Sequence, residues 1–437
     1  MALKLSVIGT GYLGATHAAC MASLGFDVVG IDVDESKISQ LKLGKVPFFE
    51  PELEPLLAEQ IASGRLTFTT DFSAIADCDV HFICVGTPQM KDGLAADISY
   101  VNASLDAVAK IVKSGALVVG KSTVPVGTAM RLREKLLSIN PAADLAWNPE
   151  FLREGFAVED TLHPSRLVVG VMSDSAENIL KEVYAANLAE GTPWVRSDLP
   201  TAELVKVAAN SFLATKISFI NAMAEICDAS GADVTVLAQA IGYDPRIGNK
   251  FLQAGIGFGG GCLPKDIRAF MARAGELGAT ESLEFLREID SINNRSRNKV
   301  VEMAKRELGG SCEGKRVAVL GAAFKPNSDD IRDSPALYIA SQLKVAGADV
   351  VVHDPKAIEN SKKKYPELSY VDSVDELLAG ADLVLHLTEW KQYREIDPVH
   401  AKSLAHGAII IDGRNALDMN AWSSAGWRIH AVGRTSR

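Results

Sequence analysis

The chain has 437 residues, of which 47% are hydrophobic and 23% are charged, and its formal net charge at pH 7 is −10. These values exclude a disordered, collagenous or low-complexity chain, and the length predicts two to four domains. A mildly acidic chain without a basic stripe does not favour nucleic-acid binding. No apolar run approaches the roughly 18 residues of a membrane span, so we expect no membrane insertion.

The six cysteines show no CxxC pair and no regular spacing. This pattern favours neither a disulfide framework nor a zinc site, and it fits a reducing compartment. The first residues run directly into strand-like sequence, without the apolar segment and cleavage site of a signal peptide. We therefore expect a cytoplasmic protein with no resident metal.

The N-terminal segment predicts the beginning of a parallel α/β sheet. An apolar strand at 3–8 is followed by Gly9-x-Gly11-x-x-Gly14, an alanine-rich helix to residue 24, and a second strand that ends at Asp32. This order of strand, glycine turn, helix, strand and acidic residue is typical of a dinucleotide-binding unit. Further strands are predicted at 80–85, 117–119, 145–147 and 167–171.

The same segment predicts the cofactor. The glycines would let the backbone approach a pyrophosphate at the helix N-terminus. Asp32 would accept hydrogen bonds from a ribose diol and repel a 2′-phosphate, which favours NAD over NADP. Lys37 weakens this inference because it could offer a cation nearby. A packing turn without a ligand is the alternative interpretation.

A similar pattern recurs near the C-terminus, with a strand at 316–320, a helix at 334–345 and a strand at 350–353. The second turn keeps a single glycine, so a pyrophosphate could not approach its backbone as closely. Basic residues nevertheless follow strand ends, where α/β proteins bind ligands: Lys325, Arg332 and Arg414. They predict a site for a different phosphate-bearing molecule, and ordinary surface charge is the alternative.

Between these segments, residues 201–230 have helical composition, with Thr201 as the expected N-cap. The predicted fold class is therefore α/β, with two Rossmann-like parallel-sheet domains joined by a long central helix. We place the NAD-binding domain at 1–200, a central helical domain at 201–300 and a C-terminal Rossmann-like domain at 301–437. The helix has more apolar residues than one face needs, which indicates a subunit interface. Burial within its own chain is the alternative.

Residues 255–261 contain five glycines. Glycine at that density costs conformational entropy, and close approach of a ligand explains it better than stability does. Pro264 suits the first turn of a following helix, which would place Cys262 at or just before the helix N-terminus and beside Lys265. A helix N-terminus and a nearby lysine both lower the pKa of a thiol and so favour the thiolate. Cys262 is therefore the predicted reactive cysteine, whereas the other five are interpreted as small hydrophobic residues.

Two further pairs of polar residues lie in patterns that suit catalysis. Lys206 and Asn210 are four residues apart on the predicted helix and share a largely apolar face. Such a lysine either snorkels to solvent or stabilises a developing oxyanion. Residues 148–155 predict a short helix on which Glu150 and Glu154 project together, as a catalytic base or as ordinary acids at a helix start.

Together these segments resemble the nucleotide-sugar 6-dehydrogenase family over essentially the whole chain. Family members often have Ser before the cysteine and Phe after it, whereas this chain has Gly261 and Leu263. The resemblance depends on ordered blocks: the dinucleotide turn, Val85-Gly86-Thr87-Pro88, Ser122-Thr123-Val124-Pro125, Asn148-Pro149-Glu150-Phe151-Leu152-Arg153-Glu154, Lys206 with Asn210, Gly259-Gly260-Gly261-Cys262-Leu263-Pro264-Lys265-Asp266, and Phe324-Lys325 with Asp330-Ile331-Arg332.

The resemblance implies an NAD-dependent four-electron oxidation of the C6 alcohol of UDP-glucose to UDP-glucuronate, with two NADH formed. Cys262 would form a thiohemiacetal and then a thioester, which water hydrolyses. The implied catalytic residues are Cys262, Lys206, Asp266, Glu150, Asn210 and Thr123. The implied cofactor contacts are Gly9, Gly11, Tyr12, Leu13, Gly14, Asp32, Lys37, Gly86, Thr87, Thr123, Glu154, Lys265 and Arg332.

The resemblance also implies a nucleotide-sugar site and a homodimer, in which Arg246 reaches the partner's site. The implied sugar-nucleotide contacts are Glu150, Phe151, Leu152, Arg153, Glu154, Lys206, Asn210, Arg246, Phe251, Leu252, Gln253, Ala254, Gly255, Gly259, Lys325 and Arg414.

Three other functions remain open at this point. The first is a 6-dehydrogenase for another nucleotide sugar, GDP-mannose or a UDP-N-acetylhexosamine. The second is a two-electron hydroxyacid-type NAD-dependent dehydrogenase, which would not need Cys262 and would form one NADH per substrate. The third is a non-catalytic NAD-binding oligomer, which gives no role to the loop at 255–266.

Overall fold

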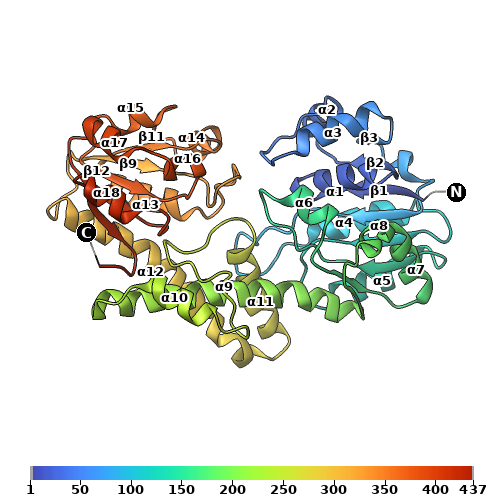
Figure 1. Cartoon of the computed structure of the whole chain (residues 1–437). Coiled ribbons are helices and arrows are strands. Elements are labelled where there is room, and N and C mark those ends of the chain that lie inside the picture. Colours follow the sequence, from blue (N-terminus) through green and yellow to red (C-terminus); the bar gives the residue numbers. More distant parts are fainter. Residues whose placement is uncertain (1–2, 436–437) are drawn as a thin grey trace. The chain divides into compact units, whose positions relative to one another are not determined.

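The computed structural model describes residues 3–435, which fold as two compact units. The first unit contains residues 3–209 together with 268–278. The second contains residues 210–267 together with 279–435. Each unit is built around one sheet with helices packed on its faces (Figure 1).

The sheet of the first unit has the strand order β3-β2-β1-β4-β5-β6-β7-β8. Neighbouring strands from β3 to β6 are parallel, as the sequence predicts. The exception is the β6–β7 pair, which is antiparallel, so β7 and β8 run against the rest of the sheet. The strands are β1 (Lys4–Ile8), β2 (Asp27–Ile31), β3 (Leu66–Thr69), β4 (Val80–Ile83), β5 (Leu117–Gly120), β6 (Asp144–Trp147), β7 (Leu167–Gly170) and β8 (Trp194–Ser197).

The central strands of this sheet are covered on both faces, and every residue of β4 and β5 is buried. Continuous apolar runs of this kind are typical of parallel strands between two helical layers. The helices of the first unit are α1 (Tyr12–Ser23), α2 (Glu35–Lys42), α3 (Leu53–Ala62), α4 (Ser99–Ala109), α5 (Thr128–Ile139), α6 (Ala157–Leu162), α7 (Asp174–Val183) and α8 (Ala185–Ala189).

The sheet of the second unit is parallel throughout, with the strand order β11-β10-β9-β12-β13-β14. In each sheet, successive strands of the chain are added first on one side of the sheet's first strand and then on its other side, as in doubly wound nucleotide-binding folds. The predicted fold class is confirmed. The strands are β9 (Arg316–Leu320), β10 (Asp349–His353), β11 (Ser369–Tyr370), β12 (Leu383–His386), β13 (Ile409–Asp412) and β14 (Arg428–Ala431), and the helices around them are α13 (Pro335–Val345), α14 (Ile358–Lys364), α15 (Val374–Leu378), α16 (Lys391–Arg394), α17 (Pro398–Leu404) and α18 (Met419–Ser424).

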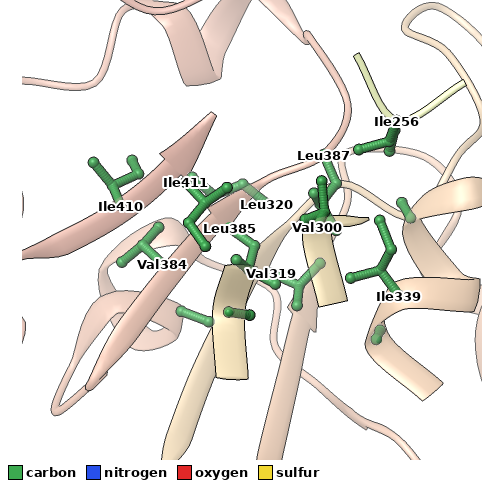
Figure 2. Close-up of a cluster of buried hydrophobic side chains, with 14 of the residues drawn as sticks. Ile256, Val300, Val319, Leu320, Ile339, Val384, Leu385, Leu387, Ile410 and Ile411 are labelled. Carbon is green, nitrogen blue, oxygen red and sulfur yellow. The ribbon is translucent and has the colours of Figure 1, made fainter. Parts of the chain in front are cut away.

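The core of the second unit joins this sheet to the glycine-rich loop. Side chains of β9, β12 and β13 pack with Ile339 of α13 and with Val300 (Figure 2). Ile256, the second residue of the glycine-rich loop at 255–261, belongs to the same cluster and is completely buried. The loop is thus anchored in the core by one apolar side chain.

The long helix predicted between the two α/β segments is α9 (Leu199–Ser230). Thr201 is not its N-cap, because the helix begins two residues earlier. The Asp198 carboxylate accepts a hydrogen bond of 2.7 Å from the Thr201 backbone N–H, and Pro200 suits the first turn. The remaining helices are α10 (Val234–Gly242), α11 (Leu263–Glu276) and α12 (Glu284–Glu307). Within residues 3–435, no helix is long and apolar enough to cross a membrane.

One side of α9 is apolar and exposed in this chain. Phe212, Phe219 and Ile226 follow one another at intervals of seven residues, and they are 67%, 46% and 61% exposed. Residues seven apart lie on the same side of a helix. The apolar excess that the sequence shows in this helix is therefore partly exposed, and the subunit interface stays a prediction.

Candidate functional site

The glycine turn of the first unit has the shape that a phosphate group needs. Gly14 packs directly on the Gly9 carbonyl, and a Cβ on Gly9 would come within 2.9 Å of the Val85 backbone. Gly11 differs, because a Cβ there would enter open space with no atom within 4 Å. Gly11 is also the N-cap of α1 and provides no side chain that caps the helix. The first N–H groups of α1 therefore face an open cradle suited to an anion.

Asp32 stands beside this turn at the end of β2. Its Oδ2 accepts hydrogen bonds from the Thr10 backbone N–H at 2.8 Å and from Lys37 Nζ at 2.7 Å. Burial raises the pKa of Asp32, but the bonds from Lys37, Asp34 and Thr10 outweigh it, so the pKa lies below its ordinary value. Lys37 is thus paired with Asp32 in this structure, and a contact between Lys37 and the cofactor stays a prediction.

The loops after β4 and β5 are joined by side-chain hydrogen bonds. Thr87 Oγ1 donates to the Thr123 carbonyl at 2.8 Å. Ser122 Oγ donates to the Val85 carbonyl at 2.7 Å. Gly86 is exposed between them. The predicted hydroxyl at Thr123 is thus carried by a loop whose backbone is fixed.

Lys206 forms an ion pair with Glu150, with Nζ 2.9 Å from Oε1. Both side chains are largely buried, at 7% and 15% exposed. Lys206 Nζ also lies 5.6 Å from the centre of the Phe151 ring, and Arg166 stacks on that ring at 3.8 Å. A lysine that snorkels to solvent would keep its ammonium exposed, so Lys206 does not snorkel, and its role with an oxyanion stays a prediction.

The short helix predicted at 148–155 is wrong. Residues 148–153 form a loop, and the next helix begins at Ala157. The Glu150 carboxylate accepts a hydrogen bond of 2.8 Å from the Leu152 backbone N–H. A side chain that bonds to nearby backbone in this way competes with helix formation. Glu150 and Glu154 therefore do not share a helical face.

This loop is held by Glu50, which the sequence did not single out, together with Tyr12. Glu50 is buried and accepts hydrogen bonds from the Gly155 and Ala157 backbone N–H groups at 2.6 and 2.7 Å. The Tyr12 hydroxyl donates to the Glu50 carboxylate and accepts a bond of 3.0 Å from Gly155 N–H. Burial, and then the Glu50 carboxylate, raise the pKa of Tyr12 far above its usual value. Glu50 thus ties the first turn of α1 to the loop that carries Glu150.

The carboxamide of Asn148, at the start of the same loop, has a buried cation for a partner. Asn148 Oδ1 accepts from Lys121 Nζ at 2.9 Å and from the Tyr184 hydroxyl at 2.6 Å. Asn148 Nδ2 donates to the Val168 carbonyl at 2.9 Å. Every polar atom of this amide is therefore used to fix the chain two residues before Glu150.

Glu203 is a second buried carboxylate that sequence patterns missed. It lies on α9, one turn before Lys206, and is 2% exposed. Its two oxygens accept hydrogen bonds from the Gly127 and Ala129 backbone N–H groups at 2.7 and 2.6 Å. Glu203 therefore caps the N-terminus of α5, next to the loop that carries Thr123.

We expect Glu203 to make stability depend on pH. Burial raises its pKa to about 7, and the bonds from Ala129 and Gly127 only partly offset this. The folded state then holds the proton at a pH where the unfolded state has lost it, so this group's contribution to stability is fully present below its unfolded pKa and falls as the pH rises towards about 7. The variant Glu203→Gln does not titrate. Stability is measured as the thermal midpoint of the variant minus that of the wild type. This difference should rise between pH 4.5 and 8, by the equivalent of up to about 3 kcal/mol in unfolding free energy. A difference that does not change with pH would contradict this assignment.

In the second unit, Cys262 is exposed, whereas the five other cysteines are buried. It immediately precedes α11, and its carbonyl accepts the first hydrogen bond of that helix from Asp266 N–H at 2.9 Å. Cys262 is therefore the N-cap residue, as predicted, and Pro264 stands in the first turn. A thiol at this position faces the positive end of the helix dipole, which favours the thiolate.

The first turn of α11 also brings together the other predicted catalytic residues of this unit. Asp266 is 2% exposed. Its carboxylate accepts a hydrogen bond of 2.6 Å from Asn210 Nδ2 and pairs with Lys265 Nζ at 2.6 Å. Asn210 and Asp266 thus hold one another beside the cysteine's helix.

The glycines at 255–261 are crowded by other parts of the chain. A Cβ on any of the five would lie less than 3.0 Å from protein atoms, and the approach of a ligand to them stays a prediction. Gly257 and Gly260 also have φ angles of +85° and +84°, which other residues rarely adopt. The atoms that the five glycines meet belong to Asn293, Phe324, Arg332, Asp333 and Gly413.

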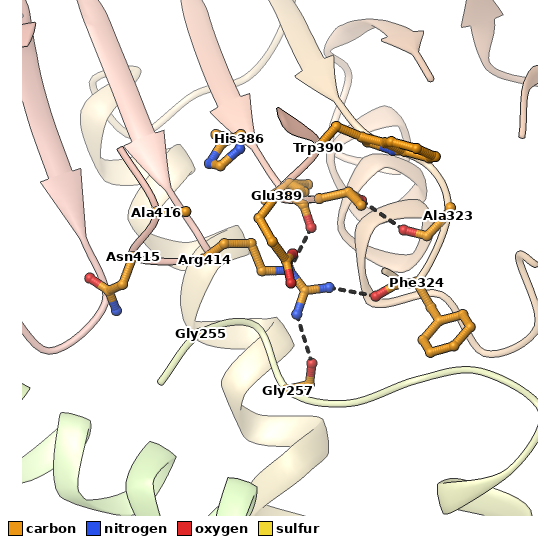
Figure 3. Close-up of polar contacts among 12 residues, drawn as sticks. Gly255, Gly257, Ala323, Phe324, His386, Glu389, Trp390, Arg414, Asn415 and Ala416 are labelled. Atoms are coloured by element: carbon orange, nitrogen blue, oxygen red, sulfur yellow. Dashed lines mark hydrogen bonds and ion pairs between the residues drawn. The ribbon is translucent and has the colours of Figure 1, made fainter. Parts of the chain in front are cut away.

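Arg414 fastens this loop to the strand ends of the second sheet (Figure 3). Its guanidinium donates to the carbonyls of Leu387 at 2.8 Å, Phe324 at 2.8 Å and Gly257 at 3.3 Å. The Glu389 carboxylate lies 3.3 Å from Arg414 Nε. Arg414 therefore has a structural role, and its contact with a sugar nucleotide remains a prediction.

The turn after β9 is held by an aspartate of the second unit. Asp354, at the end of β10, accepts hydrogen bonds from the backbone N–H groups of Ala322 at 2.8 Å and Ala323 at 3.0 Å. It also accepts from Lys356, Ala357 and the Trp390 indole. Its carboxylate therefore fixes the turn after β9, as the bond from Thr10 N–H to Asp32 does in the first unit.

Several predicted binding residues are already paired within the chain. Arg153 binds Asp160 through two nitrogens, at 2.8 and 2.7 Å. Ion pairs of 2.6 Å also join Arg246 to Asp244 and Arg332 to Asp330. Arg246 is 87% exposed.

The chain matches models of three successive domains of one family. Residues 3–188 match the NAD binding domain, residues 200–295 the central domain and residues 318–419 the UDP binding domain of the UDP-glucose/GDP-mannose dehydrogenase family. The chain belongs to this family. A UDP-glucose 6-dehydrogenase of Rhizobium meliloti (strain 1021) is 41% identical over 437 residues, covering 99% of this chain and 100% of that protein.

Other relatives agree with this assignment. A UDP-glucose 6-dehydrogenase of Bacillus subtilis (strain 168) is 41% identical, covering 99% of this chain and 93% of the relative. The solved structure of a UDP-glucose dehydrogenase from Pyrobaculum islandicum has a TM-score of 0.91 and 36% identity, and the match covers 100% of this chain and 98% of that one.

The residues of the first unit fit the NAD that the family uses. The open cradle at Gly11 suits a pyrophosphate, and Asp32 at the end of β2 suits a ribose diol. Within residues 3–435, no three His, Cys, Asp or Glu side chains are grouped so that they could hold a metal ion.

Proposed function

We propose that this protein oxidises the C6 alcohol of UDP-glucose to the carboxylate of UDP-glucuronate, with Cys262 as the nucleophile and two NAD as acceptors. The observation that carries the proposal is Cys262 itself, which is the one exposed cysteine among the described residues and the N-cap of α11. The choice of UDP-glucose is supported by the relatives. Those named for UDP-glucose are 36% to 41% identical, whereas a structure named for UDP-D-ManNAc, from Pyrococcus horikoshii, is 26% identical.

The chemistry requires a nucleophile that retains the aldehyde. Held at the glycine turn and Asp32 of the first unit, NAD would supply the acceptor for two electrons in each of the two oxidations. Between them, the Cys262 thiolate adds to the C6 aldehyde, and its new C–S bond gives a thiohemiacetal. The second oxidation converts this to a thioester. Water then attacks the carbonyl carbon, the C–S bond breaks, and the thiol is restored. Overall, one alcohol, one water and two NAD give one carboxylate, two NADH and three protons.

We assign the charged groups to the steps in which oxygen becomes negative. Lys206 stabilises the alkoxide, and Glu150, its partner at 2.9 Å, orients the hydrolytic water or accepts its proton. We assign the hydrogen-bonded pair Asn210 and Asp266 to polar contacts near Cys262. Thr123 provides a further hydroxyl. The proposed contacts of the sugar nucleotide include residues 251–255, Gly259, Lys325 and Arg414.

The stoichiometry of NADH tests this function. The wild-type protein should form two NADH for each UDP-glucose consumed, with UDP-glucuronate as the product. GDP-mannose and UDP-N-acetylglucosamine, offered under the same conditions, should give kcat/KM values lower by about 10²-fold or more. One NADH per substrate would indicate a two-electron dehydrogenase, and NAD binding without turnover would indicate a non-catalytic protein.

We also propose that the protein is a homodimer in which Arg246 reaches the partner's site. The exposed apolar stripe on α9 and the high exposure of Arg246 support this assignment. A cytoplasmic location belongs to the same proposal, because a reactive thiol needs a reducing compartment.

Phe219→Glu should convert the dimer to monomers, because it places a charge at the centre of the apolar stripe. Sedimentation velocity would measure the change. Phe156→Glu is the matched control, since Phe156 is 48% exposed in the first unit and should leave the dimer intact. If Phe219→Glu sediments like the wild type, the stripe on α9 is not the interface.

A further inference from the structure

Asn293, an asparagine of α12, forms two hydrogen bonds with the backbone of the glycine-rich loop. Asn293 Oδ1 accepts a hydrogen bond of 2.7 Å from Phe258 N–H, and Asn293 Nδ2 donates one of 3.0 Å to the Phe258 carbonyl. The side chain thus pairs with Phe258 as a neighbouring strand would. Asn293 is completely buried, and a Cβ on Gly257 would collide with its amide oxygen.

Two more buried side chains hold the same loop. Arg297 lies one turn after Asn293 on α12 and donates to the Phe258 carbonyl at 2.8 Å. It also pairs with Asp333 at 2.7 Å. From α9, Asn221 Oδ1 accepts a hydrogen bond of 2.8 Å from Gly255 N–H. The loop is therefore held at Gly255 and at Phe258, four residues before Cys262.

These hydrogen bonds are important for the conformation of the loop, because glycine has no side chain that could pack and fix the backbone. A segment with five glycines in seven residues has many accessible backbone conformations. Its position depends on the buried Ile256 side chain and on hydrogen bonds from outside the loop. Nothing in these contacts touches Cys262 directly, so their effect on it passes through the backbone.

We propose that Asn293, supported by Arg297 and Asn221, is a positioning residue that fixes the glycine-rich loop so that Cys262 captures the aldehyde before it escapes. The proposal rests on the proposed function. It assigns Asn293 to the capture step, because a thiol displaced by about 1 Å reacts about 10²-fold more slowly. The binding of NAD at the glycine turn of the first unit does not need the loop in this position.

The variant Asn293→Leu tests the proposal, because leucine is similar in size and removes both hydrogen bonds to Phe258. We expect the kcat for UDP-glucuronate formation to fall about 10²-fold and the KM for NAD to stay within twofold. NADH formed per UDP-glucose consumed should fall from two towards one. A quench with sodium borodeuteride should convert escaped aldehyde to UDP-glucose that is one mass unit heavier. Hydrogen exchange should show lost protection at Gly255 and Phe258.

Asn187→Leu is the matched control. Asn187 is also buried, at 1% exposed, and its Nδ2 donates to the Leu162 carbonyl at 2.6 Å in the first unit. It should lower the thermal midpoint yet still give two NADH. Asn293→Asp keeps the acceptor for Phe258 N–H and should give a loss intermediate between wild type and Asn293→Leu, which provides a second variant if leucine prevents folding.

The outcomes separate the two proposals. If Asn293→Leu or Asn293→Asp keeps two NADH and the wild-type kcat, Asn293 does not position the cysteine. The same conclusion follows if Asn187→Leu releases as much aldehyde. If the wild-type protein itself does not form two NADH, the proposed function fails, and hydrogen exchange at Gly255 and Phe258 still decides whether Asn293 holds the loop.

Discussion

Cys262→Ser should bind NAD as tightly as the wild-type chain and release no UDP-glucuronate. A serine hydroxyl at the N-cap of α11 remains protonated near neutral pH and is a far weaker nucleophile than a thiolate. The variant therefore cannot retain the aldehyde as a thioester precursor. We expect the rate of acid release to fall by about three orders of magnitude or more, measured by chromatography of the product, with NAD affinity measured by calorimetry.

The matched control is Cys312→Ser. Cys312 lies in the same unit but is 3% exposed, and burial raises the pKa of its thiol. It should lose some stability, form two NADH per UDP-glucose and release acid at the wild-type rate. Release of UDP-glucuronate by Cys262→Ser at an unchanged rate would exclude a covalent mechanism at this residue.

The parts of the site that depend on local sequence could be predicted. Gly9, Gly11 and Gly14 form the expected turn, because their spacing matches one strand-to-helix connection. Cys262 precedes a helix because Pro264 fixes the first turn after it. In both cases the residues that determine the geometry lie within a few positions of the residue that uses it.

The predictions that failed depend on contacts between distant segments. A short helix was expected at 148–155. The Glu150 carboxylate bonds instead to the nearby Leu152 N–H, Asn148 is fixed by Lys121 and Tyr184, and the backbone after Gly155 is capped by Glu50. No local pattern marks such partners, which lie up to 107 positions away. The glycines at 255–261 gave a clear signal that something approaches the backbone. The structure shows that protein atoms do so at all five glycines, and the approach of a ligand stays a prediction.

Lys206→Met should lower both stability and turnover. Methionine fills the space of the lysine stem but leaves the Glu150 carboxylate, which is 15% exposed, without the ammonium at 2.9 Å. Removing one member of a largely buried ion pair costs about 3–5 kcal/mol. Loss of a group that stabilises a developing oxyanion lowers kcat by about 10²–10³-fold. Urea unfolding and steady-state NADH formation measure the two effects.

The double variant Lys206→Met with Glu150→Gln separates the two effects. Neutralising Glu150 removes the unpaired charge, so stability should recover by a few kcal/mol relative to the single variant. Turnover should not recover, because neither the cation for the alkoxide nor the carboxylate for water is restored. A lysine with no catalytic role would instead regain activity together with stability. In the double variant, recovery of stability without recovery of turnover therefore indicates a catalytic Lys206, whereas recovery of both indicates a lysine retained for packing.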